Sequence, residues 1–293
     1  MMMVSLSLYA QTGTSVKANE KQEPASCFAR FVPERSDDFA WENDKVAFRT
    51  YGPALRGQGV NSGIDCWLKR VDYPIINKWY AGNLKGISYH KDHGEGYDPY
   101  HVGFSRGCGG LALWLNGKLV PSDIFTQWKV IEKSAGRVVF VLTFEWKHAG
   151  NQYTEKKQIT LKAGDRLFHA QSTFRKNGEI AVGLPIAVGL TTHDGKAHAL
   201  ADVKKGWIAC WETIDGSGLG TGVVMAPERI KKYKLVESKK KESSHALLIT
   251  TTDAHGQVDY AAGYGWAKAG EITNADEWIS YLKQRSRNQT CCK

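Results

Sequence analysis

The sequence has no run of about 20 apolar residues, the length that a membrane-spanning helix needs. None of its six cysteines belongs to a Cys-x-x-Cys pair, so neither a zinc site nor a thioredoxin-like motif has support. The chain shows no internal repeat and no low-complexity tract apart from one lysine-rich segment. These absences argue against a multi-span membrane protein and predict that the scattered cysteines are small core residues, with Cys291 and Cys292 set apart in a frayed C-terminal end.

The excess of positive charge is confined to two short segments, and the rest of the chain is electrically balanced. The net charge is +9, and residues 231–241 and 283–293 together carry all of it. A nucleic-acid-binding protein usually has basic residues built into a face of its body. We therefore expect a solvated basic loop and a basic tail, and no nucleic-acid partner.

The first ten residues, MMMVSLSLYA, are apolar and end in a small residue, but they lack the basic leader of a full secretory signal. We interpret residues 1–27 as the distal part of a signal peptide and a linker, and residues 28–290 as one domain. This interpretation predicts a periplasmic or secreted protein. The alternative is the leader of a cytoplasmic protein.

Short alternating apolar runs with turn signals between them fill the rest of the chain. They cover residues 46–50, 138–146, 152–162, 167–174, 180–190, 207–213, 220–225, 245–252 and 258–266. This pattern predicts an all-β fold, an antiparallel β-sandwich, rather than alternating strands and helices. One helix is expected near residues 274–286, because Asn274 and Glu277 form a capping box before the apolar stripe of Trp278, Ile279 and Leu282.

Residues 77–110 lack regular periodicity, which is typical of a functional loop. The densest polar cluster within them is His90, Lys91, Asp92, His93 and Glu95. Imidazole titrates near neutral pH and carboxylates tune it, so we expect an acid/base cluster with His93 as a catalytic group. The alternatives are a solvated loop or a divalent-cation site, although no metal-ligand spacing is matched and we expect no cofactor.

Two further residues are candidates for catalysis. Arg106 lies in the glycine-rich segment FSRGCGG, where its guanidinium could grip the carboxylate of a uronic acid at two points. His193 follows an apolar strand, and a strand end is a rigid platform for an imidazole. Both residues could equally be structural.

Aromatic and acidic side chains supply candidate sugar contacts. The aromatic platforms are Trp41, Trp79, Tyr80 and Trp266, and the acids beside Trp41 are Asp38 and Glu42. Such carboxylates could bind hydroxyls or act as a base. The alternatives are aromatic core residues and a solvated strand edge.

Several motifs resemble one bacterial family, the domain of unknown function 4861. They are ERSDDFAWEND at 34–44, HKDHGEG at 90–96, SRGCGG at 105–110 and GYGW at 263–266. The resemblance implies a galactose-mutarotase-like β-supersandwich. It also implies a secreted product of carbohydrate-utilisation loci, often beside enzymes that act on pectin and other uronate polysaccharides.

The resulting hypothesis is a carbohydrate-active enzyme that acts on a uronate-containing, pectin-like oligosaccharide or polysaccharide by lyase or mutarotase/isomerase chemistry. His93 and His193 are expected to share one pocket with Arg106 and Trp79. The alternatives are a non-catalytic sugar-binding protein and a glycoside hydrolase that uses paired carboxylates.

Overall fold

The computed structural model describes residues 27–290, so the predicted leader over residues 1–27 lies outside it except for Cys27. Within that range the strands form three antiparallel sheets. The first contains, in spatial order, β1 (Phe28–Val32), β2 (Asp38–Glu42), β3 (Ala47–Thr50), β4 (Ile64–Lys69) and β5 (Gly96–Tyr97). The second contains β14 (His198–Asp202), β15 (Trp207–Ile214), β16 (Ser217–Val224), β19 (Gln257–Trp266), β11 (Leu167–Lys176), β10 (Asn151–Lys162), β9 (Arg137–His148) and β8 (Gln127–Lys133), with β12 (Glu179–Ile180) paired to β11. The third contains β17 (Lys232–Val236), β18 (His245–Thr251), β13 (Pro185–Thr191), β6 (Cys108–Leu115) and β7 (Lys118–Pro121).

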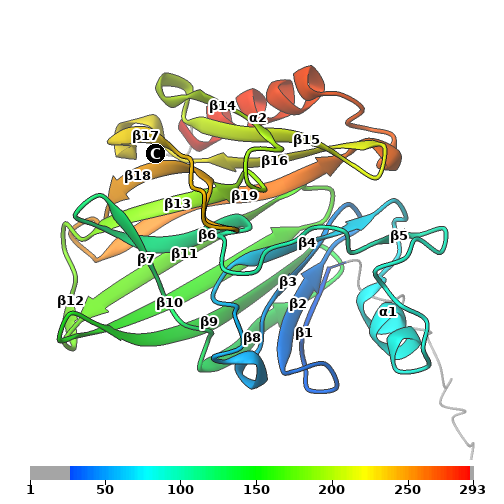
Figure 1. Ribbon diagram of the computed structural model, residues 1–293, viewed down its shortest axis with the longest axis horizontal. Coiled ribbons are helices and arrows are strands. Elements are labelled where there is room, and N and C mark those ends of the chain that lie inside the picture. Colours follow the sequence, from blue (N-terminus) through cyan, green and yellow to red (C-terminus); the bar gives the residue numbers. More distant parts are fainter. Residues whose placement is uncertain (1–26, 291–293) are drawn as a thin grey trace, which may run out of the picture.

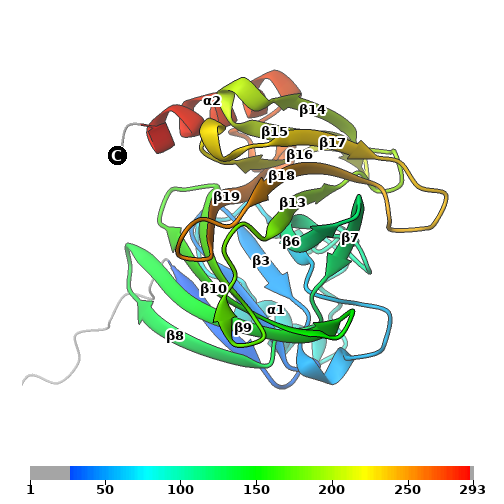
Figure 2. The ribbon, with the colours of Figure 1, turned by 90° about the vertical axis from the view of Figure 1, so that its left-hand side faces the viewer.

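The nine-stranded sheet forms one layer, and the two five-stranded sheets lie side by side as the other (Figure 1). Figure 2 shows the large sheet curling from β14 to β8 around the inner strands. Aromatic rings from both layers meet in the core, where the ring centre of Trp41 lies 5.2 Å from that of Phe140 and 5.8 Å from that of Phe168. The predicted antiparallel β-sandwich is confirmed, and it is the large two-layered architecture that the family resemblance implies.

A parallel bridge between Ile64 and Gly107 joins the two smaller sheets. Gly107 has a φ of +56°, and a Cβ on it would lie 2.0 Å from the carbonyl oxygen of Ile64. Only glycine fits this close approach, because it has no Cβ and tolerates left-handed backbone. The glycine-rich segment SRGCGG therefore closes the seam of the smaller layer.

Strand β10 shows how side-chain alternation produces the two layers. Its buried residues recur at every second position, and its exposed residues face solvent on the other side of the sheet. The buried positions include the charged residues Glu155 and Lys157. An ion pair therefore lies on the buried face of β10, with Lys157 Nζ 3.5 Å from Glu155 Oε1.

Two predictions about local structure need correction. Residues 77–110 are not one irregular loop, because helix α1 (Ile76–Asn83) occupies the start of this segment and β6 its end. The basic segment 231–241 is partly a strand, β17, at the edge of the third sheet. Exposed lysines on an edge strand discourage pairing with other chains.

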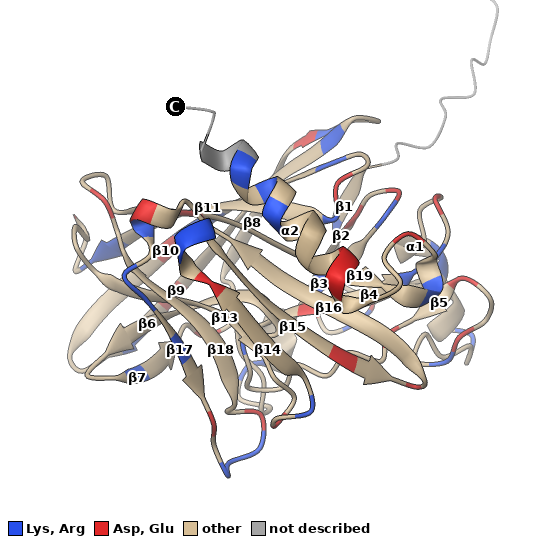
Figure 3. Ribbon diagram, turned by 90° about the horizontal axis from the view of Figure 1, so that it is seen from above, with Lys and Arg blue, Asp and Glu red and all other residues tan. Residues whose placement is uncertain are grey.

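Helix α2 (Ala275–Thr290) confirms the predicted C-terminal helix and its cap. The N–H of Glu277 donates to Asn274 Oδ1 at 3.0 Å, and Trp278 and Leu282 are buried against β15, β16 and β19. The helix lies across the outer face of the large sheet (Figure 3). The described part of the chain also contains four short 3-10 helices in its connections: η1 (Pro53–Leu55), η2 (Val203–Lys205), η3 (Pro227–Arg229) and η4 (Ala267–Ala269). Among residues 27–290, no helix is long and apolar enough to cross a membrane.

Candidate functional site

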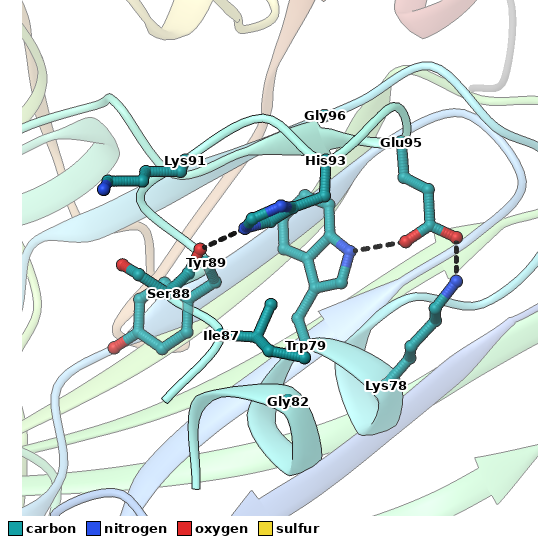
Figure 4. Close-up of a pocket in the computed structure, with 10 residues that line it drawn as sticks. All are labelled: Lys78, Trp79, Gly82, Ile87, Ser88, Tyr89, Lys91, His93, Glu95 and Gly96. Carbon is teal, nitrogen blue, oxygen red and sulfur yellow. Dashed lines mark hydrogen bonds and ion pairs between the residues drawn. The ribbon is translucent and has the colours of Figure 1, made fainter. Parts of the chain in front are cut away.

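A pocket of about 310 Å³ lies between α1 and the loop that follows it (Figure 4). Its volume falls in the range of small-molecule sites. We call it the helix pocket. It is lined by Lys78, Trp79, Gly82, Ile87, Ser88, Tyr89, Lys91, His93, Glu95 and Gly96.

The position of α1 depends on Glu42. Its carboxylate accepts the main-chain N–H groups of Ile75 and Ile76 at 2.9–3.0 Å, where the helix begins. Lys69 Nζ lies 3.0 Å from Glu42 Oε2, and both side chains are fully buried. A carboxylate here satisfies the orphan N–H groups and complements the helix dipole. Glu42 therefore positions the wall of the pocket and is closed to substrate.

Trp79 and Glu95 form one side of the helix pocket. The indole Nε1 of Trp79 donates to Glu95 Oε2 at 3.2 Å, and Lys78 Nζ donates to Glu95 Oε1 at 2.6 Å. The Tyr73 hydroxyl donates to the same carboxylate. Burial favours the neutral acid, but these hydrogen bonds outweigh it and lower the pKa of Glu95. Glu95 is therefore a fixed anion that orients the indole.

His93 and Lys91 form the exposed side. His93 Nε2 lies 3.0 Å from the carbonyl oxygen of Ser88, which fixes a tautomer with the proton on Nε2. Within residues 27–290 no hydrogen bond occupies the other ring nitrogen, Nδ1, and no carboxylate pairs with Lys91. The pocket thus offers the Nδ1 lone pair of His93 beside the ammonium group of Lys91, which no described carboxylate pairs with.

The other candidates of the 90–98 segment lie outside the pocket lining. His90 Nδ1 is 2.9 Å from the carbonyl oxygen of Asp98, and Asp92 pairs with Arg70 at 2.5 Å. Trp266 is fully buried, with the guanidinium of Arg70 5.7 Å from its ring centre. His90, Asp92 and Trp266 therefore hold the loop in position from outside the pocket.

Asp38 belongs to a buried ion cluster beneath α1. Arg49 lies 3.6 Å from Asp38, 3.0 Å from Asp98 and within hydrogen-bond distance of Asp65. Burial raises the pKa of Asp98 well above its usual range and also raises that of Asp38. Three carboxylates around one fully buried guanidinium give a rigid base for the first sheet. Tyr80, 1% exposed, packs over this cluster.

Arg106 and Trp41 lie in the interior. The guanidinium of Arg106 donates to the carbonyl oxygen of Leu111 at 2.8 Å, to Ser62 Oγ at 3.2 Å and to Asn61. Burial lowers the pKa of Arg106 to about 10. Every one of these acceptors is internal, so we interpret Arg106 as a structural residue. Trp41 is fully buried in the core and offers no face to a sugar.

A second pocket, of about 450 Å³, contains His193, and we call it the histidine pocket. It is lined by Pro99, His101, Thr191, His193, Asp194, Lys196, Glu212, Thr213, Ile214, Asp215, Lys241 and Glu242. His193 Nδ1 lies 2.8 Å from both oxygens of Glu212, and Nε2 lies 2.8 Å from the carbonyl oxygen of His101. Both ring nitrogens of His193 therefore have a partner within the protein, one a carboxylate and the other a main-chain carbonyl oxygen.

The loops around the histidine pocket are tied to one another. Glu242 contacts His101 Nε2 at 2.5 Å, the N–H of Phe104 at 2.9 Å and, through its own N–H, Asp194 Oδ1 at 2.9 Å. His193, Asp194 and Glu242 have positive φ angles of 46°, 57° and 62°. Left-handed backbone at such residues is costly and clusters at functional sites.

The structure does not bring His93, His193 and Arg106 together. His93 lines the helix pocket, His193 lines the histidine pocket, and Arg106 lies in the core. Sequence reasoning also missed Glu212, Glu242 and His101. Glu212 looks like an ordinary strand residue, and Glu242 follows three lysines, so neither carried a sequence signal.

No three His, Cys, Asp or Glu side chains of the described range come together as a metal site. The ring nitrogens of His90 and His93 that form hydrogen bonds face main-chain carbonyl oxygens. The divalent-cation alternative at these histidines therefore gains no support from their geometry. The cysteines at 27, 66, 108 and 210 are buried, as predicted.

The profile of a domain of unknown function, DUF4861, matches residues 4–291. The chain belongs to this family. It is also 38% identical over 274 residues to "Uncharacterized protein P7" of Formosa agariphila, which covers 89% of this chain and 67% of that protein. The match to the DUF4861 family thus includes the residues of both pockets and of both layers of the sandwich.

The structure of this chain is distantly similar to parts of larger solved proteins. A heparan sulfate lyase HepC mutant from Pedobacter heparinus matches with a TM-score of 0.43 and 10% identity, over 81% of this chain and 36% of that one. The GH36 alpha-galactosidase AgaB from Geobacillus stearothermophilus matches with a TM-score of 0.39 and 10% identity, over 86% and 43%. The chain spans less than half the length of these structures. So distant a likeness says nothing of substrate or reaction.

Proposed function

We propose that this protein is an exported carbohydrate-active enzyme that acts on a uronate-containing, pectin-like oligosaccharide in the helix pocket. The lining of that pocket carries the proposal. Trp79 provides an aromatic wall for the apolar face of a sugar ring, and Lys91 provides an ammonium group for a carboxylate. His93 provides a base beside them, because its Nδ1 has no other partner in the described range.

The proposed reaction is a β-elimination. Nδ1 of His93 removes the proton from C5 of the uronate, and the electron pair of that bond forms a C4–C5 double bond. The C4–O bond breaks, and the leaving oxygen takes a proton from water. Lys91 stabilises the negative charge that develops on the carboxylate. Proton transfer at the anomeric hydroxyl by the same imidazole is the mutarotase alternative.

The second candidate function is sugar binding without chemistry. The state of Glu95 favours it. The carboxylate of Glu95 accepts hydrogen bonds from Lys78, Trp79 and Tyr73, so it is not free to act as an acid or a base. A hydrolase has less support, because it needs two carboxylates about 5–9 Å apart. Among the described residues that line the helix pocket, Glu95 is the one carboxylate.

The test of the lyase proposal is turnover of uronate oligosaccharides, followed through the ultraviolet absorbance of the new double bond and through reducing ends. We expect His93→Ala to lower turnover roughly 10²–10⁴-fold, the effect of losing an acid/base group. The matched control is His255→Ala, which changes an exposed histidine outside both pockets. Full activity in His93→Ala would overturn the assignment.

Binding separates recognition from chemistry. We expect Lys91→Gln to weaken binding of a uronate ligand about ten-fold, as for the loss of one charge-assisted hydrogen bond, and to leave a neutral sugar unaffected. The control is Lys85→Gln, an exposed lysine just after α1 that does not line the pocket. Uronate binding by the unmodified protein without turnover would favour the sugar-binding alternative, and unchanged uronate binding in Lys91→Gln would contradict both.

A further inference from the structure

We infer that the histidine pocket is a second subsite for the same glycan, one that holds an uncharged, hydroxyl-rich sugar. This inference rests on the proposed function, since the uronate of that glycan occupies the helix pocket. It adds a substrate class, a chain that contains both uronate and neutral sugars.

The two pockets lie next to each other along the chain and in space. Gly96 lines the helix pocket and Pro99 lines the histidine pocket, and three residues of chain span at most about 11 Å. Between them, the Tyr97 hydroxyl donates to Asp215 Oδ2 at 2.9 Å. This bond holds the segment that starts at β5 against the turn between β15 and β16 (Figure 1). This proximity is what the second subsite requires, because one short oligosaccharide has to occupy both pockets.

The lining of the histidine pocket suits hydroxyl groups. A sugar hydroxyl both donates and accepts hydrogen bonds, and it finds ammonium donors and carboxylate acceptors in one cavity. Lys196 and Lys241 supply the donors, and Asp194 and Asp215 supply exposed acceptors. The internal hydrogen bonds of Asp194 and Asp215 each use one carboxylate oxygen, which leaves the other for a ligand.

The same lining disfavours a second uronate. Four carboxylates face this cavity, those of Asp194, Glu212, Asp215 and Glu242, against the ammonium groups of Lys196 and Lys241. Glu212 and Glu242 are occupied by the imidazoles of His193 and His101. The remaining two, Asp194 and Asp215, would lie beside an incoming carboxylate, and like charges in contact weaken binding. The helix pocket has the opposite balance, with two lysines and one carboxylate.

The test uses two conservative substitutions that suit the local backbone. Asp194 and Asp215 have positive φ angles of 57° and 46°, which asparagine tolerates, and Asn-Gly is favoured in the turn at 215–216. The variant is therefore Asp194→Asn/Asp215→Asn. Its control is Asp259→Asn/Asp276→Asn, which changes the charge equally at positions outside both pockets. Calorimetry compares a uronate monosaccharide, a homo-uronate tetrasaccharide and a tetrasaccharide that alternates uronate with a neutral sugar.

We expect the mixed tetrasaccharide to bind roughly ten-fold tighter than the other two ligands. Asp194→Asn/Asp215→Asn should remove most of this ten-fold difference in affinity and leave the affinity for the uronate monosaccharide unchanged. The control variant should keep the ten-fold difference. Equal affinity of the two tetrasaccharides, or a margin that survives in Asp194→Asn/Asp215→Asn, would overturn the second subsite alone. If none of the three ligands bound, the proposed function itself would be overturned.

Discussion

The main-chain N–H of Arg106 donates a hydrogen bond to Nε2 of His245 at 3.1 Å. His245 must be neutral at that nitrogen to accept the bond, and the ring is buried. Burial, together with the charge of Arg106, lowers the pKa of His245 to about 4. A buried histidine that holds the main chain next to Gly107 thus makes the fold sensitive to acid.

The first prediction is a pH-dependent contribution of His245 to stability. Between pH 6.5 and about 4 the unfolded chain binds a proton at this residue and the folded chain does not, so the contribution is lost as the pH falls through this window. The loss is on the order of 3 kcal/mol. Chemical denaturation across this window should show the stability difference between the unmodified protein and His245→Gln shrinking. A constant difference would contradict the assignment, and His255→Gln serves as the exposed control.

The second prediction assigns Arg106 to stability rather than to binding. Arg106→Lys keeps the charge but loses the fork that reaches Asn61, Ser62 and Leu111. We expect the free energy of unfolding to fall by about 3 kcal/mol, because buried acceptors lose their donors. Uronate affinity of the folded variant, measured under native conditions, should not change. A loss of affinity without a loss of stability would restore the carboxylate-binding role.

The third prediction concerns the internal pair of Glu155 and Lys157. Burial lowers the pKa of Lys157, and Glu155 offsets part of that cost. Glu155→Gln should destabilise the protein by about 3–5 kcal/mol, since it leaves a buried charge without a partner. Glu155→Gln/Lys157→Met removes that charge and should recover most of the stability in urea unfolding. An additive double variant would show that the pair is not coupled.

The fourth prediction tests the docking of α2. A Cβ at Gly220 on β16 would lie 2.5 Å from Cδ1 of Trp278, so the helix would have to shift. Gly220→Ala should lower the free energy of unfolding by about 1–3 kcal/mol through overpacking. Gly136→Ala is the matched control, because a Cβ there has no heavy atom within 4 Å. Equal unfolding temperatures for the two variants would contradict tight packing of Trp278 on β16.

Local sequence signals predicted the elements better than they predicted the site. Alternation along 152–162 and the capping box at Asn274 depend on neighbouring residues only, and both β10 and α2 formed as expected. Helix α1 was missed although Ile76, Trp79 and Tyr80 follow the i, i+3, i+4 spacing of a helix, because it is only 8 residues long and its N-terminus is capped from a distance by Glu42. A cap that comes from another strand has no signature in the helix sequence.

The sequence by itself determined the β-sandwich, the terminal helix and membership of the DUF4861 family, because periodicity and local motifs specify them. Only the tertiary structure decided which polar residues face a cavity. Arg106, Glu42 and Asp38 are conspicuous in the sequence, yet each is buried against internal partners. Glu212 and His193 are 19 residues apart and meet in one pocket, whereas His93 and His193 do not. Contacts of this kind depend on which strands the fold places side by side, and no local pattern encodes that choice.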